Sequence, residues 1–171
     1  NVDLYVMNLP KEEPQQLTTT VGLEASPCWS PDDSELCFVS DRQGRPRLYL
    51  MPAAGGNPRR LLADPSECVS PSWSIASNKI CFAMRQEGRY VIAMVDMSNG
   101  TLPKDNFKVV AAKPGDWESP SWAPDGRHIV CSRTIGRRGK SLYMIDTLFG
   151  TVFPLQNFTG NDTSPTYSPL P

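Results

Sequence analysis

Ser26-Pro27-Cys28-Trp29-Ser30-Pro31-Asp32 is the stretch of sequence that decides the fold, because its core returns three more times along the chain. It recurs at residues 70–74 (Ser-Pro-Ser-Trp-Ser), 119–124 (Ser-Pro-Ser-Trp-Ala-Pro) and 164–169 (Ser-Pro-Thr-Tyr-Ser-Pro). The first serines are 44, 49 and 45 residues apart (70 − 26, 119 − 70, 164 − 119). This period is typical of repeat arrays that contain one four-stranded unit per repeat.

Two further columns of residues recur with the same period and in the same order. The first is apolar and contains Leu4–Asn8, Leu48–Pro52, Ile92–Asp96 and Leu142–Asp146. The second follows the aromatic phrase at a constant offset and contains Leu36–Phe38, Ile80–Phe82 and Ile129–Cys131. Both consist of short apolar runs between turn signals such as Pro124-Asp125-Gly126, and such runs indicate β-strands.

The composition supports an all-β globular domain and argues against several function classes. Apolar residues make up 39% and charged residues 20% of the chain, which is ordinary for a globular protein. Proline accounts for 17 of 171 residues, roughly twice its usual share of about 5%, which favours strands and turns. The net charge of −1 gives no basis for binding nucleic acid. Without a run of about 20 apolar residues we expect no direct membrane insertion, and any signal peptide is expected upstream.

Four short antiparallel strands every 44 to 50 residues predict a β-propeller with four-stranded blades. Since a blade cannot cover both of its apolar faces alone, we expect Trp29, Trp73 and Trp122 to be buried between neighbouring blades. The predicted units are the end of one blade at 1–20, blades at 21–64, 65–112 and 113–158, and a closing strand at 159–171.

The cysteines and the single histidine do not indicate a metal or catalytic site. Cys37, Cys81 and Cys131 lie in an apolar strand column, where we expect small, inert, buried thiols. The chain has no Cys-x-x-Cys pair and no Cys/His spacing suited to zinc. His128 is expected on the surface at the start of a strand. We therefore predict that the protein needs no cofactor.

The repeat resembles that of the TolB family of periplasmic β-propellers. The resemblance rests on Ser-Pro-x-Trp-Ser-Pro-Asp, followed by an apolar strand and by Ser40–Tyr49 (Ser-Asp-Arg-Gln-Gly-Arg-Pro-Arg-Leu-Tyr). The ending Ser164–Pro171 is similar to that family's own carboxyl terminus, where a lone aromatic phrase completes the ring. The resemblance covers essentially the whole chain and implies roughly the last four of six blades. The turn at 75–78 (Ile-Ala-Ser-Asn) and the five cysteines depart from the usual pattern.

The resemblance implies a non-enzymatic scaffold located in the periplasm. Family members bind the peptidoglycan-associated lipoprotein Pal and the inner-membrane protein TolA. They belong to the Tol-Pal system, which maintains outer-membrane integrity and helps constrict the envelope at cell division. We therefore expect protein partners and a monomeric state.

Charged residues near the strand ends predict a partner-binding face. In a four-stranded blade, the loop between the second and third strands shares one face of the disc with the connection to the next blade. Nine of the 17 basic residues lie in or beside these loops: Arg42, Arg45, Arg47, Arg85, Arg89, Arg133, Arg137, Arg138 and Lys140. An acid stands just before each aromatic strand: Glu24, Glu67, Glu118 and Asp162. We predict that these acids ring the channel mouth and that, with Asp41, the face binds a partner peptide.

Trp117 is the only tryptophan outside the repeat columns, in the polar connector Lys113–Glu118. Two interpretations are open for it. An exposed loop tryptophan is a good interface anchor, and Trp117 would then belong to the binding face. Alternatively, its side chain caps the edge of a blade.

Two enzyme classes compete with the scaffold interpretation. Similar repeats form the propeller of prolyl-oligopeptidase-like hydrolases, but the chain has no Gly-x-Ser-x-Gly nucleophile motif. A sugar or lactone hydrolase would hold calcium in the channel, with the four acids as ligands. No ring of asparagines accompanies those acids, so we predict that the chain is not an enzyme.

Overall fold

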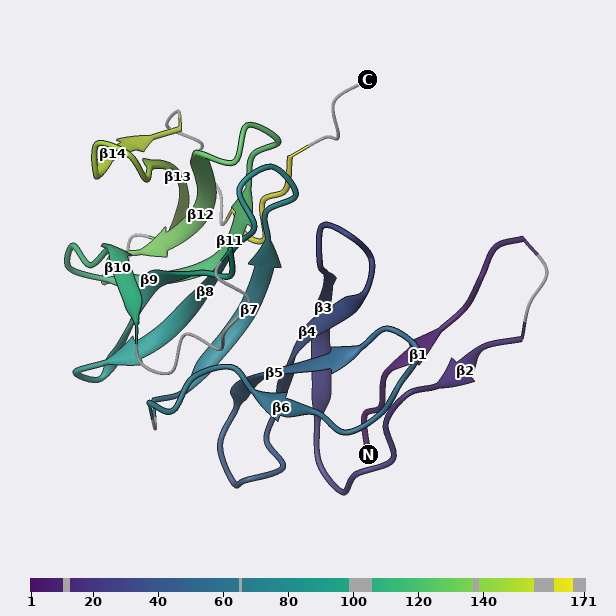
Figure 1. Cartoon of the computed structure of the whole chain (residues 1–171). Coiled ribbons are helices and arrows are strands. Elements are labelled where there is room, and N and C mark those ends of the chain that lie inside the picture. Colours follow the sequence, from purple (N-terminus) through teal and green to yellow (C-terminus); the bar gives the residue numbers. More distant parts are fainter. Residues whose placement is uncertain (11–12, 65, 99–105, 137–138, 156–161, 168–171) are drawn as a thin grey trace.

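The computed structural model describes residues 1–10, 13–64, 66–98, 106–136, 139–155 and 162–167. All regular elements in these ranges are strands, which form three four-stranded antiparallel sheets and one two-stranded hairpin (Figure 1). The predicted all-β class with four-stranded antiparallel blades is therefore confirmed. Within the described ranges, no helix could cross a lipid bilayer.

Each four-stranded sheet is a meander in which strands consecutive in the chain are paired. The hairpin contains β1 (Tyr5–Val6) and β2 (Gln15–Gln16). Blade I contains β3 (Glu24–Trp29), β4 (Glu35–Ser40), β5 (Arg47–Pro52) and β6 (Arg59–Arg60). Blade II contains β7 (Cys68–Trp73), β8 (Lys79–Gln86), β9 (Arg89–Asp96) and β10 (Phe107–Ala111). Blade III contains β11 (Asp116–Trp122), β12 (His128–Thr134), β13 (Lys140–Asp146) and β14 (Thr151–Pro154).

The repeated Ser-Pro dipeptide has the same backbone conformation at every occurrence. The four serines have left-handed φ values of 53°, 53°, 51° and 52° at Ser26, Ser70, Ser119 and Ser164. In all three blades the register of the first strand shifts at this point, which marks a β-bulge. Proline has no N–H to donate to the ladder, so pairing is interrupted where it stands. The sequence repeat is thus also a repeat of local structure.

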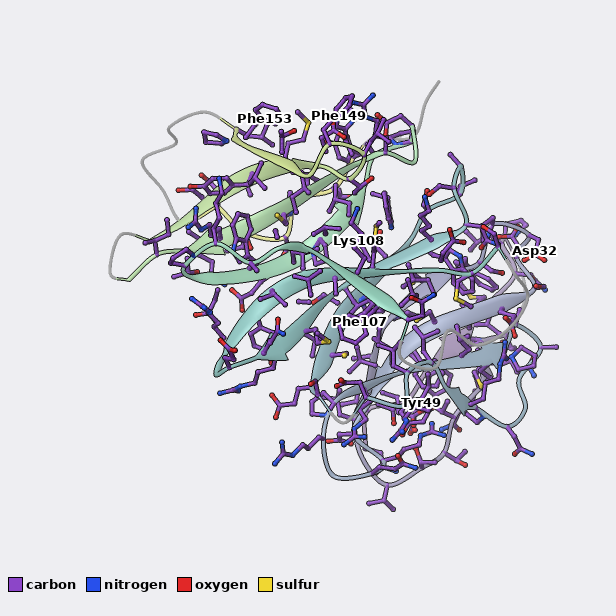
Figure 2. All side chains as sticks on the ribbon, turned by 60° about the vertical axis from the view of Figure 1, so that its left-hand side comes forward. Asp32, Tyr49, Phe107, Lys108, Phe149 and Phe153 are labelled. Atoms are coloured by element: carbon purple, nitrogen blue, oxygen red, sulfur yellow. The ribbon has the colours of Figure 1, made fainter. Side chains whose placement is uncertain are left out.

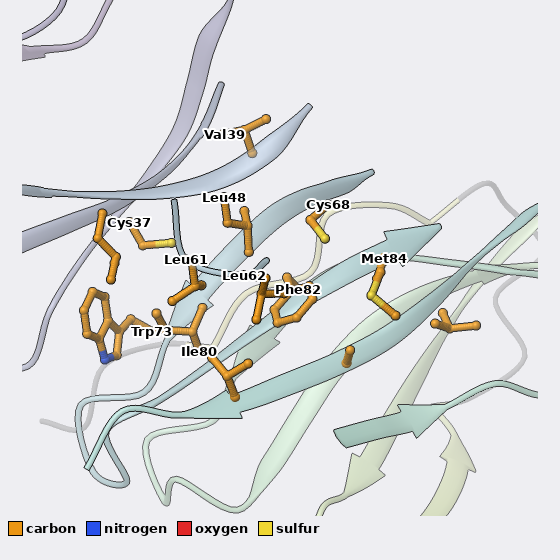
Figure 3. Packing of buried hydrophobic residues seen from close by; sticks show 14 residues of the cluster. Cys37, Val39, Leu48, Leu61, Leu62, Cys68, Trp73, Ile80, Phe82 and Met84 are labelled. Atoms are coloured by element: carbon orange, nitrogen blue, oxygen red, sulfur yellow. The ribbon is translucent and has the colours of Figure 1, made fainter. Parts of the chain in front are cut away.

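Consecutive blades pack through the first strand of the later blade. Strand β7 packs against β3, β4 and β5, and β11 packs against β7, β8 and β9. One core cluster lies between blades I and II and includes Leu48, Trp73 and Phe82 (Figure 3). A second lies between blades II and III and includes Trp122 and Ile129. The expected burial of Trp73 and Trp122 is confirmed.

Trp29 differs from its two counterparts and corrects the expectation from sequence. It is 44% exposed, whereas Trp73 and Trp122 are 9% and 7% exposed. Both buried tryptophans pack against the four-stranded blade that precedes their own. Trp29 instead lines an open pocket of about 620 Å³ together with Val6 of β1 and Ala53. Two short strands do not cover the ring, so its burial is not achieved in the described part of the chain.

The expected buried thiols are confirmed. Cys37, Cys81 and Cys131 have no exposed surface. Burial raises the pKa of the Cys131 thiol to about 12, so that it is un-ionised and inert at neutral pH. His128 is half-buried at the start of β12, with Nδ1 2.5 Å from Asp125 Oδ2.

The outer edges of blades II and III carry apolar and basic side chains. Figure 2 shows Phe149 and Phe153 at one end of the molecule, and both are exposed. The Arg127 guanidinium lies 4.8 Å from the centre of the Phe149 ring. Lys108 of β10 donates from Nζ to the Thr147 carbonyl at 3.5 Å. This contact links the outer strand of blade II to blade III.

Candidate protein-interaction face

One end of the blades carries the connections between second and third strands, and we call it the loop face. It consists of residues 41–46 in blade I, 87–88 in blade II, and 135–136 and 139 in blade III, with the adjoining strand ends. Here the structure brings acids from near the start of each first strand, or from the residue before it, next to bases of the same blade. The pairs are Glu24–Arg42, Glu67–Arg85 and Glu118–Lys140. The expected grouping of acids and bases at one end is therefore present as pairs within blades.

The pair in blade I is buried and serves the structure. The Glu24 side chain has no exposed surface, and that of Arg42 is 16% exposed. Glu24 Oε1 accepts hydrogen bonds from Thr20 Oγ1 at 2.5 Å, from Ser40 Oγ at 3.1 Å and from Arg42 Nη2. Burial raises the pKa of Glu24, but hydrogen bonds with Thr20, Thr18 and Arg42 and the charge of Arg42 outweigh it, so the pKa lies below its ordinary value. Glu24 is thus ionised at neutral pH and out of reach of a partner.

The pairs in blades II and III are accessible. Arg85 Nη1 lies 3.3 Å from Glu67 Oε2, and Lys140 Nζ lies 2.6 Å from Glu118 Oε2. The four side chains keep between 23% and 49% of their surface exposed. Exposed pairs of this kind contribute only about 0–1 kcal/mol to stability, so a partner can exchange them for its own charges at little cost.

An arginine stacks on an aromatic ring in every blade at the loop face. Arg42 lies 4.8 Å from the centre of the Tyr49 ring, and Arg85 lies 6.0 Å from that of Tyr90. In blade III the Arg133 guanidinium lies 4.7 Å from the Trp117 ring and also donates to the Pro114 carbonyl. Stacking fixes the position of a guanidinium and leaves its edge able to donate hydrogen bonds.

A pocket of about 390 Å³ lies between blades II and III at the loop face. Its walls carry two bases and two acids together with one aromatic ring: Arg85, Lys140, Asp116, Glu118 and Tyr90. Asp116 Oδ1 accepts the Tyr90 backbone N–H at 3.0 Å, which joins the two blades. Thr134 also lines the pocket, and its Oγ1 is buried without a hydrogen-bond partner among the described residues.

The sequence did not single out Tyr90, Asp116 or Thr134, and it placed Lys140 only among the basic residues. Asp116 had a usable signal, because it stands three residues before Ser119 as Glu67 stands three before Ser70. Tyr90 and Thr134 had no such signal. The repeat pattern predicts that they lie in strands, but it does not predict which neighbouring blade their side chains contact.

The four acids do not form one ring, which corrects that part of the expectation. Glu24 and Asp162 precede their repeat serine by two residues, Glu118 by one and Glu67 by three. Neighbouring residues of a strand point to opposite sides of the sheet. Consistent with this, the register equivalents of Glu24 in blades II and III are Cys68 and Trp117, both buried. Asp162 is half-buried with Oδ2 unpartnered among the described residues.

Trp117 is not an exposed anchor, because it has no solvent-exposed surface. Its indole N–H donates to the Lys113 carbonyl at 2.8 Å, and its ring meets Tyr143 edge-on with centres 5.2 Å apart. Trp117 belongs to the core cluster between blades II and III, with Ile92 and Trp122.

Asp41 caps the loop that leads into β3. Its Oδ1 accepts the Leu23 N–H at 2.8 Å. A Cβ added to Gly22, whose φ is +145°, would stand only 2.4 Å from the same oxygen. Glycine is required here because the loop and the carboxylate approach so closely. These contacts give Asp41 a structural role in holding the loop.

Several solved structures share this fold. A protein named TolB from Agrobacterium tumefaciens matches with a TM-score of 0.75 at 19% identity, over 90% of this chain and 55% of that one. TolB from Acinetobacter baumannii matches with a TM-score of 0.50 at 16% identity, over 94% and 50%. A puromycin-hydrolysing peptidase from Mycobacterium tuberculosis matches with a TM-score of 0.65 at 17% identity, over 84% and 22%. The chain spans about half the length of the TolB structures.

At such identities the structural matches establish the propeller fold alone. The sequence itself matches the TolB β-propeller domain family over residues 1–170. That match covers the aromatic phrase, the strand columns and the turns between them. This chain therefore belongs to the TolB β-propeller domain family.

Proposed function

We propose that this chain is a non-catalytic, periplasmic protein-binding module of the Tol-Pal type, which binds the lipoprotein Pal and TolA through its loop face. The observation that carries this proposal is the pocket between blades II and III, where accessible charges of both signs surround Tyr90. Bound in this way, the module would help to maintain outer-membrane integrity and to constrict the envelope at division.

The chemistry of the pocket suits a protein segment better than a small apolar ligand. Arg85 and Lys140 can receive a carboxylate of the partner, while Asp116 and Glu118 can receive an amino or guanidinium group. The stacked Tyr90 ring offers apolar contact next to them. Interfaces of this type gain specificity and association rate from complementary charge, and aromatic and arginine residues often carry their affinity.

The environment of His128 supports a non-catalytic role. A Ser-His-Asp mechanism needs one imidazole nitrogen directed at a serine hydroxyl. Here Nδ1 lies 2.5 Å from Asp125 Oδ2, and Nε2 lies 3.7 Å from Asp146 Oδ2. Both nitrogens therefore face carboxylates, and His128 is the chain's single histidine. Among the described residues, no group of three or more His, Cys, Asp or Glu could hold a metal ion.

The alternative function is the propeller of a larger prolyl-oligopeptidase-like hydrolase. It is favoured by the similarity to a puromycin-hydrolysing peptidase, of which this chain spans 22%. In that case the catalytic residues would lie outside the sequence described here. A puromycin-hydrolysis assay on the full-length gene product distinguishes the alternatives, since a hydrolase would show turnover there and a binding module would not.

The binding proposal is tested by isothermal titration calorimetry against purified Pal and the periplasmic part of TolA. The variant carries Arg85→Glu with Lys140→Glu, which reverses the charge on both basic walls of the pocket. We expect the dissociation constant for at least one partner to rise about tenfold or more, equivalent to 1.4 kcal/mol. Glu24 is unsuitable for charge reversal because it is fully buried.

The matched control is Arg59→Glu. Arg59 is also an exposed arginine in an ion pair, with Nη1 2.5 Å from Glu35 Oε1, but at the opposite end of blade I. We expect the affinity of the Arg59→Glu variant for Pal and TolA to change by less than about twofold. Equal losses in the control and the double variant, with both proteins folded by circular dichroism, would place binding elsewhere and refute the role of the loop face.

A further inference from the structure

Two of the five cysteines stand directly opposite each other on neighbouring strands of blade I. Cys28 of β3 is the register partner of Cys37 of β4, one position from the partners Trp29 and Leu36. Both are present as free thiols. Cys37 is fully buried, and Cys28 is half-buried at the edge of the core between blades I and II. Figure 3 shows the Cys37 side chain within this core.

The other blades have the same site without the second thiol. In blade II the corresponding partners are Ser72 and Cys81, and in blade III they are Ser121 and Val130. The repeat therefore supplies two internal controls for the pair in blade I. Only there, among the three described sheets, do two cysteines face each other across the ladder.

The spacing of opposed residues permits a disulfide. Directly opposite Cα atoms in antiparallel strands are about 4.5–5.5 Å apart, within the range of about 4.4–6.8 Å that disulfides span. Burial, and after it a hydrogen bond with the Cys28 thiol, raise the pKa of Cys37. The distance between opposed Cβ atoms, about 4.5–5.5 Å, is at the upper end of the Cβ–Cβ distances found in disulfides. The bond would therefore be strained and readily reduced.

We propose that Cys28 and Cys37 are a redox-active dithiol, which a small-molecule disulfide oxidises to a cross-strand disulfide within blade I. Cys28 reacts first, because it is the more accessible of the two. Its thiolate attacks the oxidant R–S–S–R, forms Cys28–S–S–R and releases R–S⁻. The Cys37 thiolate then attacks Cys28 Sγ, closes the protein disulfide and releases the second R–S⁻. The two protons from the cysteine thiols pass to the two leaving thiolates, and the oxidant gains two electrons.

The remaining thiols are not expected to compete. Cys68, Cys81 and Cys131 are buried, so an oxidant cannot reach them first as it can reach the half-buried Cys28. Their register partners are Met84, Tyr143 and Ser72, none of which is a thiol. Oxidation is therefore selective for blade I.

The experiment incubates the intact protein with mixtures of reduced and oxidised glutathione at increasing oxidant fraction. Acid quenching in denaturant, alkylation with N-ethylmaleimide and peptide mass mapping then report each cysteine. We expect Cys28 and Cys37 to lose alkylation together, in a linked peptide lighter by two hydrogen atoms, while the other three stay alkylated. Ser72→Cys should create a second linked pair with Cys81, and Cys28→Ser should abolish the first.

Three outcomes would overturn the proposal. In one, all five cysteines stay alkylated at every glutathione ratio. In another, glutathione stays on Cys28 while Cys37 is still alkylated. In the third, Cys28 is linked to a cysteine other than Cys37. A second readout does not depend on mapping: under oxidised glutathione the urea midpoint of unfolding should rise in the natural protein and stay unchanged in Cys28→Ser.

Discussion

Blades I and II contain the same repeat but use its tryptophan differently. Trp29 and Trp73 occupy one position in the phrase, and their serines share a φ of 53°. Trp73 packs into the core against blade I, whereas Trp29 faces the hairpin β1–β2 and stays 44% exposed. The repeat thus fixes the conformation of a blade, and the preceding blade decides whether its aromatic ring is buried.

The same two blades differ at the position two residues before the repeat serine. Blade I has Glu24 in a buried ion pair with Arg42, and blade II has the buried thiol of Cys68. The acid–base pair of blade II is formed one residue earlier, by Glu67, and is exposed. A shift of one residue along a strand moves a side chain to the other side of the sheet, which changes a structural charge into an accessible one.

The largest effect on stability should come from replacing each of the two tryptophans by alanine. We expect Trp73→Ala to lower the free energy of unfolding by about 3–5 kcal/mol, because it leaves a cavity between two blades. Trp29→Ala should cost about 1.5 kcal/mol or less, since much of its ring is already in water. Urea unfolding followed by circular dichroism measures both. Similar losses for both variants would mean that Trp29 is covered in solution and that the contrast between the blades is absent.

The next largest effect should come from the two glutamates. Glu24→Gln leaves the Arg42 charge buried without its counterion, and we expect a loss of about 3 kcal/mol in the free energy of unfolding. Glu67→Gln removes the equivalent charge from an exposed pair, so the loss should stay within about 1 kcal/mol. Urea denaturation at neutral pH measures both. Equal costs would show that burial does not distinguish the two ion pairs.

The smallest effect should come from the turn after the tryptophan. Asp32 of blade I accepts hydrogen bonds from Ser30 Oγ at 2.7 Å and Ser34 Oγ at 2.8 Å, which lower its pKa to about 2. Blade II has Ala76 at this position. Between pH 4 and 2 the unfolded state binds the proton more readily, so stability from Asp32 is present above about pH 4 and is lost as the pH falls toward 2.

We therefore expect Asp32→Ala to be less stable than the natural protein at pH 6 and nearly equal to it at pH 2. Thermal unfolding across this pH range measures the difference. Asp125→Ala provides a parallel case, because Asp125 holds the same turn in blade III and its pKa is also lowered to about 2. A difference that is constant with pH would contradict the assignment to an ionised carboxylate.

Much of the fold follows from the sequence, because its signals are local. The aromatic phrase, the strand columns and the Pro-Asp turns each act within a few residues and return at a fixed period. The candidate site was less accessible to such reasoning. The acids and bases of the loop face were found, but their pairing, the pocket beside Tyr90 and the burial of Trp117 depend on contacts between residues far apart in the chain.

The sequence by itself determined the strands, the turns between them and the membership in a repeat family. Local backbone preferences and alternation of side chains are sufficient for these. The tertiary structure alone decided which tryptophan is buried, which charges are shielded and which thiols meet. These outcomes depend on what packs against a blade from outside. The same repeat motif occurs in every blade, so the motif does not specify which neighbour covers it.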